Sequence, residues 1–250
     1  MEGLRGIAVF LVFWVHYSSL AEPWLTGYSV PVSTFIHGFG HLGVDLFFVL
    51  SGYLIYGSII DKPTLAAARY GKRRALRIYP TFLVVFAAYI ALSFVFPSES
   101  KLPEGITNKL VYILQNLLLL PGLFDINPII TVAWSLSYEV FYYLAIPCLI
   151  LPLQMKKWRV EVRIVAWSAV LVAGFASFAI FGGPVRLMMF IAGILLYELY
   201  AKKGVSLGGW GTTFLVLGLA VFGLRTLTDI HRLVLKRRMK QAPVQVWHAR

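Results

Sequence analysis

Apolar runs of about 20 residues recur along this chain of 250 residues, and they restrict what it can fold into. Because a helix rises 1.5 Å per residue, about 20 apolar residues cross the roughly 30 Å hydrocarbon core of a bilayer. Hydrophobic residues make up 59% of the sequence and charged residues 14%, whereas soluble domains carry about 25% charged residues. We therefore expect an all-α, polytopic transmembrane helix bundle.

The distribution of Lys and Arg predicts how this bundle is oriented. The segment 61–77 holds six basic residues, whereas the predicted loop 22–39 holds none. Basic segments stay on the cytoplasmic side, so the N-terminus is expected to be cytoplasmic. The expected crossing segments are 4–21, 40–60, 78–97, 131–152, 164–181, 185–201 and 207–224.

The apolar segment 110–122 is short for a crossing and stops at Pro121-Gly122. If it does not cross, the basic residues between 156 and 163 also fall on the cytoplasmic side. We therefore favour a re-entrant or interfacial helix at 110–122, and an eighth span is the alternative. The bundle is expected to have seven or eight spans.

The domain organisation follows from the same pattern. Residues 1–224 form one expected transmembrane domain, and 225–250 form a basic C-terminal tail. The formal charge of +12 is assigned to cytoplasmic loops that face anionic lipid. We therefore expect a multi-pass protein of the cell inner (plasma) membrane whose partner is the bilayer and not nucleic acid. The sequence contains no P-loop and no His-Glu-x-x-His spacing, so no bound metal or cofactor is expected.

The first apolar segment carries two ionisable residues, Arg5 and His16. Eleven residues separate them, which brings both to nearly the same face of a helix, about 16 Å apart along its axis. Ionisable side chains inside a membrane span are costly and mark candidate functional sites. Residues 1–21 could also be a signal peptide, but Glu2 offsets Arg5, and His16 and Tyr17 fit poorly in one.

Two carboxylates are expected at the depth of His16. In the predicted topology, Asp45 and Glu139 both lie in the outer half of their spans, as His16 does. A carboxylate fixes the tautomer of a histidine, whose free nitrogen then takes a proton from a hydroxyl. Ser135, Tyr142 and Tyr143 share the helix face of Glu139 at spacings of three and four. The alternative is that His16 is a buried, hydrogen-bonded residue that bridges helices.

Arg73, Arg74 and Arg77 form an arginine face if the third span begins within the basic segment. Arginine forks bind phosphate oxygens through paired hydrogen bonds, so this face could bind a phosphate-bearing donor from the cytoplasm. The alternative is a topogenic charge cluster that contacts lipid headgroups.

Four sequence blocks together resemble a known family. They are Glu2-Gly-Leu-Arg-Gly-Ile-Ala8 followed by His16, Gly43-Val-Asp-Leu-Phe-Phe-Val-Leu-Ser-Gly-Tyr-Leu-Ile55, Arg73-Arg-Ala-Leu-Arg-Ile-Tyr-Pro80, and Trp134-Ser-Leu-Ser-Tyr-Glu139 followed by Phe141-Tyr142. Their identity and order resemble acyltransferase family 3, the integral-membrane O-acyltransferases. Residues 146–224 are similar to the family only in hydropathy.

The resemblance implies roles for individual residues. Arg5 and His16 match the family's Arg-x10-His motif, in which the histidine is essential for acyl transfer. Arg74 and Arg77 match its Arg-x-x-Arg pair near the acyl-CoA. Functional roles are also implied for Asp45, Ser135 and Glu139.

The expected function is transfer of an acyl group, foremost acetyl, from acyl-CoA to a hydroxyl of a sugar or cell-envelope glycan. Acyl-CoA is then a co-substrate and the carbohydrate is the acceptor. His16 either carries the acyl group or only moves a proton, Asp45 or Glu139 steers it, and Arg5, Arg73, Arg74, Arg77, Ser135 and Tyr142 bind substrate. Two alternatives are a proton-coupled transporter or flippase, in which the three ionisable groups form a relay, and an inactive truncated membrane subunit.

Overall fold

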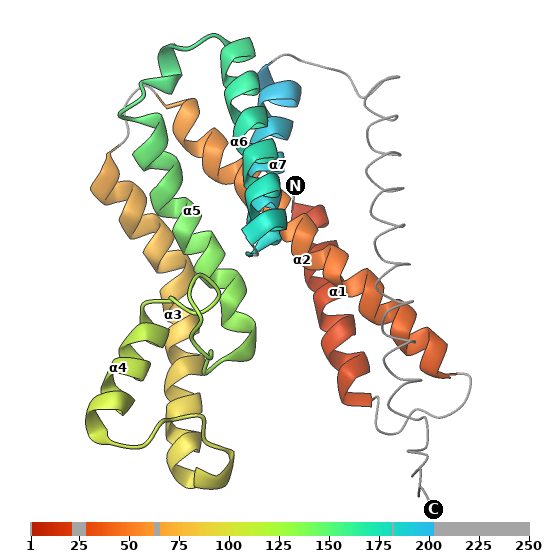
Figure 1. Ribbon diagram of the computed structural model, residues 1–250, viewed down its shortest axis with the longest axis vertical. Helices are drawn as coiled ribbons and strands as arrows, with labels where there is room; N and C mark the ends of the chain where they lie inside the picture. Colours follow the sequence, from red (N-terminus) through yellow and green to blue (C-terminus); the bar gives the residue numbers. More distant parts are fainter. Residues whose placement is uncertain (1, 22–28, 63–65, 182, 203–250) are drawn as a thin grey trace, which may run out of the picture. The chain divides into compact units, whose positions relative to one another are not determined.

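The computed structural model describes residues 2–21, 29–62, 66–181 and 183–202. Within these residues every regular element is helical, which confirms the predicted all-α class (Figure 1). Short 3₁₀ turns, Thr131–Ala133 and Val185–Leu187, lead into two of the helices, and a π turn at Glu198–Lys202 follows the last one. The helices are α1 (Glu2–Ala21), α2 (Ser29–Ile60), α3 (Ala67–Val95), α4 (Ile106–Leu117), α5 (Trp134–Ile150), α6 (Val160–Phe181) and α7 (Met188–Tyr197).

The chain divides into two compact units, and each is described by itself. The amino-terminal unit contains Glu2–Val44, and residues 203–250 lie outside the described residues. The core unit contains Asp45–Lys203. The predicted span 207–224 and the predicted tail 225–250 therefore fall outside the described residues.

Four segments are long and apolar enough to cross a membrane, counted within the described ranges. They are Gly43–Ile60, Ala67–Val95, Thr131–Ile150 and Val160–Phe178, and α1 contributes a shorter apolar stretch, Gly6–Ser18. These helices agree with a membrane protein of several spans. The total of seven or eight spans and the cytoplasmic N-terminus stay predictions.

The start of α2 differs from the sequence-based expectation. The segment 22–39 is predicted as a loop, but α2 already begins at Ser29, so the prediction is wrong for residues 29–39. Pro31 falls in the first turn, where a proline costs no intrahelical hydrogen bond. With 32 residues, α2 is about 48 Å long and exceeds the thickness of the hydrocarbon core.

Helix α4 contains 12 residues and is therefore about 18 Å long, which is too short to cross a bilayer. It starts after Gly105, whose φ of 81° lies in the left-handed region, and it ends before Leu119, whose φ is 55°. This length agrees with an interfacial or re-entrant helix rather than an eighth span. The helix begins four residues earlier than the predicted segment 110–122.

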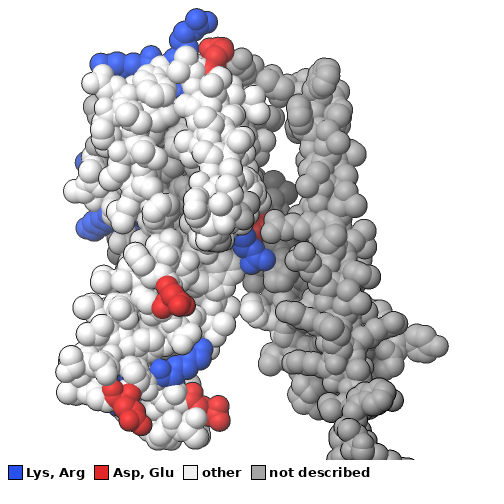
Figure 2. Space-filling model, viewed as in Figure 1, with Lys and Arg blue, Asp and Glu red and all other residues white. Residues whose placement is uncertain are grey.

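Aromatic side chains and close backbone contacts hold the core unit together. The buried Phe48 of α2 contacts the rings of Trp134, Tyr138 and Phe190, with centroids 4.9 to 5.9 Å apart. In Figure 1, α6 and α7 run side by side, and α3 lies along α5. Figure 2 shows Lys and Arg gathered where α5 passes into α6, and acidic side chains at the opposite end of the core unit, near α4.

Candidate active site

Helix α1 holds Arg5 and His16 on one continuous helix, which agrees with the predicted span 4–21. The side chain of His16 is exposed, and that of Arg5 lies outside what the structure describes. Within the amino-terminal unit, α1 meets α2 at Gly43, where an added Cβ would lie 2.7 Å from the Ala8 carbonyl oxygen. His16 belongs to this unit, whereas Asp45 and Glu139 belong to the core unit. The predicted meeting of His16 with the two carboxylates therefore stays a prediction.

Asp45 forms an ion pair with Arg186, with 3.6 Å between Oδ1 and Nε. The Arg186 guanidinium also lies over the ring of Trp134, 5.5 Å from its centroid. The Arg186 and Asp45 side chains are 36% and 19% exposed, so this pair is less shielded than a buried one. The pair thus links α2 to the turn before α7, beside the start of α5.

Glu139 is buried and accepts a hydrogen bond from the Tyr143 hydroxyl, one helical turn further along α5. The predicted shared face is confirmed for this pair. Tyr142 instead donates to the Leu187 carbonyl oxygen at 2.7 Å and stacks on Phe190, and Ser135 donates to the Val132 carbonyl oxygen at 3.0 Å. The Tyr142 hydroxyl therefore holds α5 against the turn before α7, whereas the Ser135 hydroxyl bonds within its own turn at the start of α5.

The two carboxylates lie at nearby levels of the core unit. Phe48 contacts the rings of both Trp134 and Tyr138, which fixes the register of α2 against α5. Asp45 precedes Phe48 by one helical turn, and Glu139 follows Tyr138 directly. Each therefore lies within about two turns of this aromatic cluster. Their hydrogen-bonded and ion-paired partners differ: Arg186 for Asp45 and Tyr143 for Glu139.

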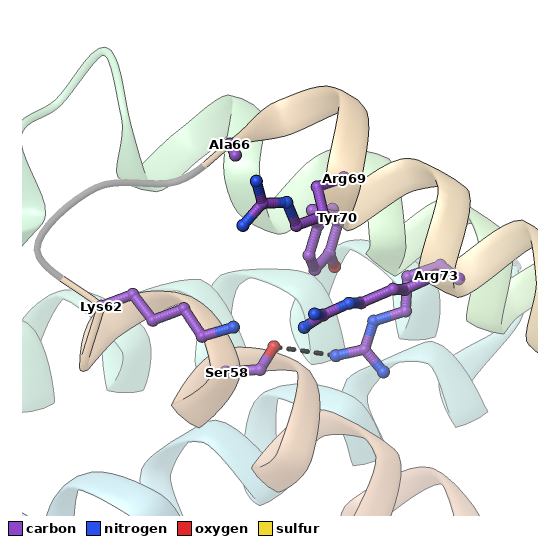
Figure 3. A pocket seen from close by; sticks show the side chains of 7 residues that line it. Ser58, Lys62, Ala66, Arg69, Tyr70 and Arg73 are labelled. Atoms are coloured by element: carbon purple, nitrogen blue, oxygen red, sulfur yellow. Dashed lines mark hydrogen bonds between the residues drawn. The ribbon is translucent and has the colours of Figure 1, made fainter.

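A cavity of about 530 Å³ lies between the end of α2 and the start of α3 (Figure 3). Its lining includes four basic residues and no acidic one: Lys62, Arg69, Arg73 and Arg74, with Ser58, Ala66 and Tyr70. In Figure 3 the Lys62, Arg69 and Arg73 side chains point into the same space. We call this the cationic cavity. Its composition suits a ligand with several negative charges, because arginine side chains bind phosphate oxygens through paired hydrogen bonds.

Arg74 is the most tightly held of these basic groups. It donates to Ser58 Oγ at 2.8 Å, and its guanidinium lies over the rings of Tyr70 and Tyr143, 5.2 and 4.9 Å from their centroids. Tyr143 in turn bonds Glu139. Arg74 thus connects the cationic cavity to the predicted catalytic carboxylate on α5. Arg77, one turn further along α3, is exposed.

An apolar groove continues from the cationic cavity along α3 and α5. Its volume is about 280 Å³, and it shares Tyr70 and Arg74 with the cavity. Beyond these two residues it is lined by apolar and aromatic groups that include Ile78, Leu144 and Pro147. The two spaces together offer a charged end and an apolar end to one elongated ligand.

A buried ion pair lies between α6 and the turn after α7. Glu198 is fully buried and accepts hydrogen bonds from Arg163 Nε at 2.6 Å and Nη2 at 3.0 Å. The Tyr56 hydroxyl donates to the same carboxylate, and Arg163 also donates to the Trp158 carbonyl oxygen at 2.8 Å. This network joins α2, α6 and the turn after α7. In the described part of the chain, no three His, Cys, Asp or Glu side chains gather as metal ligands would.

Comparison with known proteins identifies the family to which the chain belongs. The sequence profile of a protein family described as "Acyltransferase domain" (Acyl_transf_3) matches residues 1–247, nearly the whole chain. The chain belongs to this acyltransferase family. No solved structure matches it at a significant level.

Curated relatives of this acyltransferase family member come from several bacteria. A Haemophilus influenzae "Uncharacterized protein" is 38% identical over 132 residues, which cover 48% of this chain and 53% of that protein. "Exopolysaccharide production protein ExoZ" of Rhizobium meliloti is 26% identical over 74% of this chain and 59% of its own length. A Staphylococcus aureus protein named "Putative O-acetyltransferase" is 25% identical over 80% of this chain and 34% of its own length. The matched regions therefore span between about a third and three fifths of these relatives.

Sequence reasoning on this acyltransferase missed three charged residues that the structure places in networks. These residues form two ion pairs between segments that are far apart along the chain. Arg186 pairs with Asp45, and Arg163 pairs with Glu198. One signal was available, because Arg163 and Glu198 both border apolar segments, where an ionisable residue calls for a partner. Helical spacing finds partners only within one helix, so it could not identify the pairs.

Proposed function

We propose that this chain is an integral-membrane O-acyltransferase that moves an acetyl or similar acyl group from acyl-CoA to a sugar hydroxyl of a cell-envelope glycan. The family supports acyl transfer, and its relatives include proteins named "Putative O-acetyltransferase" and "Exopolysaccharide production protein ExoZ". The observation that carries the proposal is the cationic cavity with the apolar groove beside it. The proposed setting is the plasma membrane, crossed several times.

The donor is assigned to the cationic cavity because coenzyme A carries several phosphate groups. Lys62, Arg69 and Arg73 point into this space and supply the charge that phosphate oxygens need. The narrower pantetheine arm, which has no charge, then follows the apolar groove past Arg74 toward Tyr143 and Glu139. Arg77 extends the basic surface at the mouth, and Arg5 holds the donor or fixes the depth of α1. In the predicted topology this end of the core unit faces the cytoplasm, where acyl-CoA is made.

The chemistry is assigned to His16 with Asp45 or Glu139 as its orienting carboxylate. The imidazole takes the proton of the acceptor hydroxyl, and the oxygen attacks the thioester carbonyl carbon. The new C–O bond forms as the C–S bond breaks, and the CoA thiolate leaves and recovers the proton from the imidazolium. Tyr142 serves this site by positioning α5, because its hydroxyl donates to the Leu187 carbonyl oxygen of the turn before α7. Ser135, whose hydroxyl bonds Val132 within its own turn, is assigned to substrate binding at the start of α5.

The test is acyl transfer by the purified full chain in lipid nanodiscs. The protein is incubated with acetyl-CoA labelled in the acetyl group and with a cell-envelope extract, and the labelled product is identified. We expect alkali-labile label on a carbohydrate fraction, and release of free CoA at the same rate. Proton-coupled flux in liposomes without acyl-CoA, together with unlabelled glycan, would contradict the proposal and favour the transporter alternative.

A further inference from the structure

A second cleft lies at the other end of α3, beside α4. Its volume is about 820 Å³, and its polar lining comprises Lys101, Tyr112, Gln115, Asp125, Asn127 and Thr131. Lys101 follows α3, whereas the cationic cavity lies at the beginning of α3. Because α3 has 29 residues, about 43 Å separates its two ends, more than the thickness of the hydrocarbon core. We call this space the α4 cleft.

The lining of the α4 cleft differs in kind from that of the cationic cavity. It holds one cation and one carboxylate, two amides and two hydroxyl groups, so its formal charges cancel. Amides and hydroxyls both donate and accept hydrogen bonds, which matches a ligand whose own groups do both. Pro103, Pro128 and the Tyr112 ring add apolar faces. Burial raises the pKa of the Tyr112 phenol further above neutral pH.

The cleft is held in shape by hydrogen bonds behind it. The buried Asn116 donates to the carbonyl oxygens of Tyr112 and Asn127 at 3.0 and 3.5 Å and accepts from the Ile129 amide at 2.8 Å. Lys101 Nζ donates to the Pro128 carbonyl oxygen at 3.1 Å and to Thr131 Oγ1 at 3.2 Å. The segment between α4 and α5 is therefore fixed before any ligand arrives, which lowers the entropic cost of binding.

The cleft lies at the end of α5 that is nearer to a predicted catalytic carboxylate, Asp45. Thr131 begins the turn that leads into α5, and Trp134 follows one turn later. The guanidinium over the Trp134 ring belongs to Arg186, which pairs with Asp45. A ligand in the α4 cleft therefore lies on the Asp45 side of the core unit, at the opposite end from the cationic cavity.

We propose that the α4 cleft binds a pyranose unit of the acceptor glycan. That this ligand is the acceptor of an acyl group rests on the proposed function. That the cleft binds a sugar is argued from its lining residues alone. Sugar hydroxyls pair with Gln115, Asp125, Asn127 and Thr131, and the C–H face of the ring packs on Tyr112 and the prolines. The donor and acceptor then enter from opposite ends of α3, and the acceptor end is the one expected outside the cell.

The test measures binding and kinetics with the full chain in nanodiscs. The probe is a set of tritium-labelled oligosaccharide fractions, released by mild acid from the host cell envelope. The variants are Gln115→Ala and Asp125→Asn, and the matched control is Glu104→Gln, an exposed carboxylate near the cleft but outside its lining. Asn116 is left intact because it holds the segment in place.

We expect wild-type protein and the control to bind at least one fraction and each variant to bind it about tenfold more weakly, since each loses a hydrogen-bonding partner. The KM for that fraction as acceptor should rise by the same factor, with an unchanged KM for acetyl-CoA. Wild-type protein that binds none of the fractions, or variants that bind and react like the control, would overturn the inference. Oligosaccharide binding that depends on Gln115 and Asp125 without any acyl transfer would support the cleft while the proposed function fails.

Discussion

Arg74 is the residue at which the proposed donor site and the proposed catalytic region meet. Its guanidinium donates to Ser58 and lies over two tyrosine rings, one of which bonds Glu139. Side chains that only interact with lipid headgroups do not need such partners. These contacts argue against a purely topogenic role for Arg74, and phosphate binding by the arginine face stays a proposal.

At the residue scale, His16→Asn tests the assignment of the general base. Asparagine keeps a polar side chain but cannot take up a proton, so kcat for acetyl transfer should fall about 10²- to 10⁴-fold. The KM for acetyl-CoA should not change, because the donor is assigned to the core unit. Initial rates in nanodiscs measure both. Tyr17→Phe, at the next exposed position of α1, is the control, and wild-type turnover in His16→Asn would remove His16 from the mechanism.

The sequence predicted contacts between residues that are close along the chain, but not contacts between residues that are far apart along it. The spacing of four predicted that Glu139 and Tyr143 share a face, and the structure confirms their hydrogen bond. Asp45 was predicted to be functional, but its pairing with Arg186 depends on how α2 packs near the turn before α7. Hydropathy and periodicity carry no information about that packing.

At the element scale, α2 and α7 approach each other through two glycines. A Cβ added at Gly52 would lie 2.1 Å from the Phe190 carbonyl oxygen, and one at Gly193 would lie 2.0 Å from that of Val49. Both obstacles are backbone atoms, which cannot rotate away as a flexible side chain can. Close helix contact through small residues is typical of membrane bundles.

Gly52→Ala should therefore push α2 from α7 and lower the free energy of unfolding by about 1–3 kcal/mol or more. Gly71→Ala is the matched control, because nothing lies within 4 Å of its added Cβ on α3. There alanine should stabilise the helix by about 0.5–1 kcal/mol. Thermal unfolding in one detergent compares the two variants, and equal stability would contradict the close contact.

The Arg163–Glu198 pair makes a second prediction at this scale. Glu198→Ala leaves Arg163 buried without its carboxylate, which should cost about 3–5 kcal/mol of stability. Replacing both residues, as in Arg163→Met with Glu198→Leu, removes the buried charge together with its partner and should cost less. The same unfolding measurement distinguishes them. A double variant less stable than Glu198→Ala would show that this network contributes more than charge compensation.

The helices themselves were largely predictable, because apolar length alone identified the four crossing segments. The early start of α2 was missed because residues 29–39 mix glycine, serine and histidine with apolar residues and resemble a loop in hydropathy. The third span was predicted at 78–97, and a start within the basic segment 61–77 was considered only as the condition for an arginine face. The helical geometry of α3 is what brings Arg69, Arg73 and Arg74 to one cavity.

At the scale of the whole molecule, the core unit carries two unlike binding spaces at opposite ends of α3. One is lined by four basic groups, and the other has balanced charge and mixed hydrogen-bonding groups. The proposed function, with a cytoplasmic donor and an acceptor outside the cell, would use two such spaces. The all-α class and the family were accessible from the sequence, because hydropathy and short motifs encode them. The cavities were not, since each is built by segments whose packing no local pattern specifies.

The most direct measurement is equilibrium binding of radiolabelled acetyl-CoA to the full chain in nanodiscs, repeated at several salt concentrations. Binding by the wild type should weaken as salt rises, because it depends on exposed charges. The double variant Arg73→Gln, Arg74→Gln should bind about a hundredfold more weakly, whereas Arg159→Gln should match the wild type. Arg159 is a suitable control because its side chain is 85% exposed and forms a surface ion pair with Glu161, outside the lining of the cationic cavity. Wild-type affinity in the double variant would contradict the assignment of acyl-CoA to the cationic cavity.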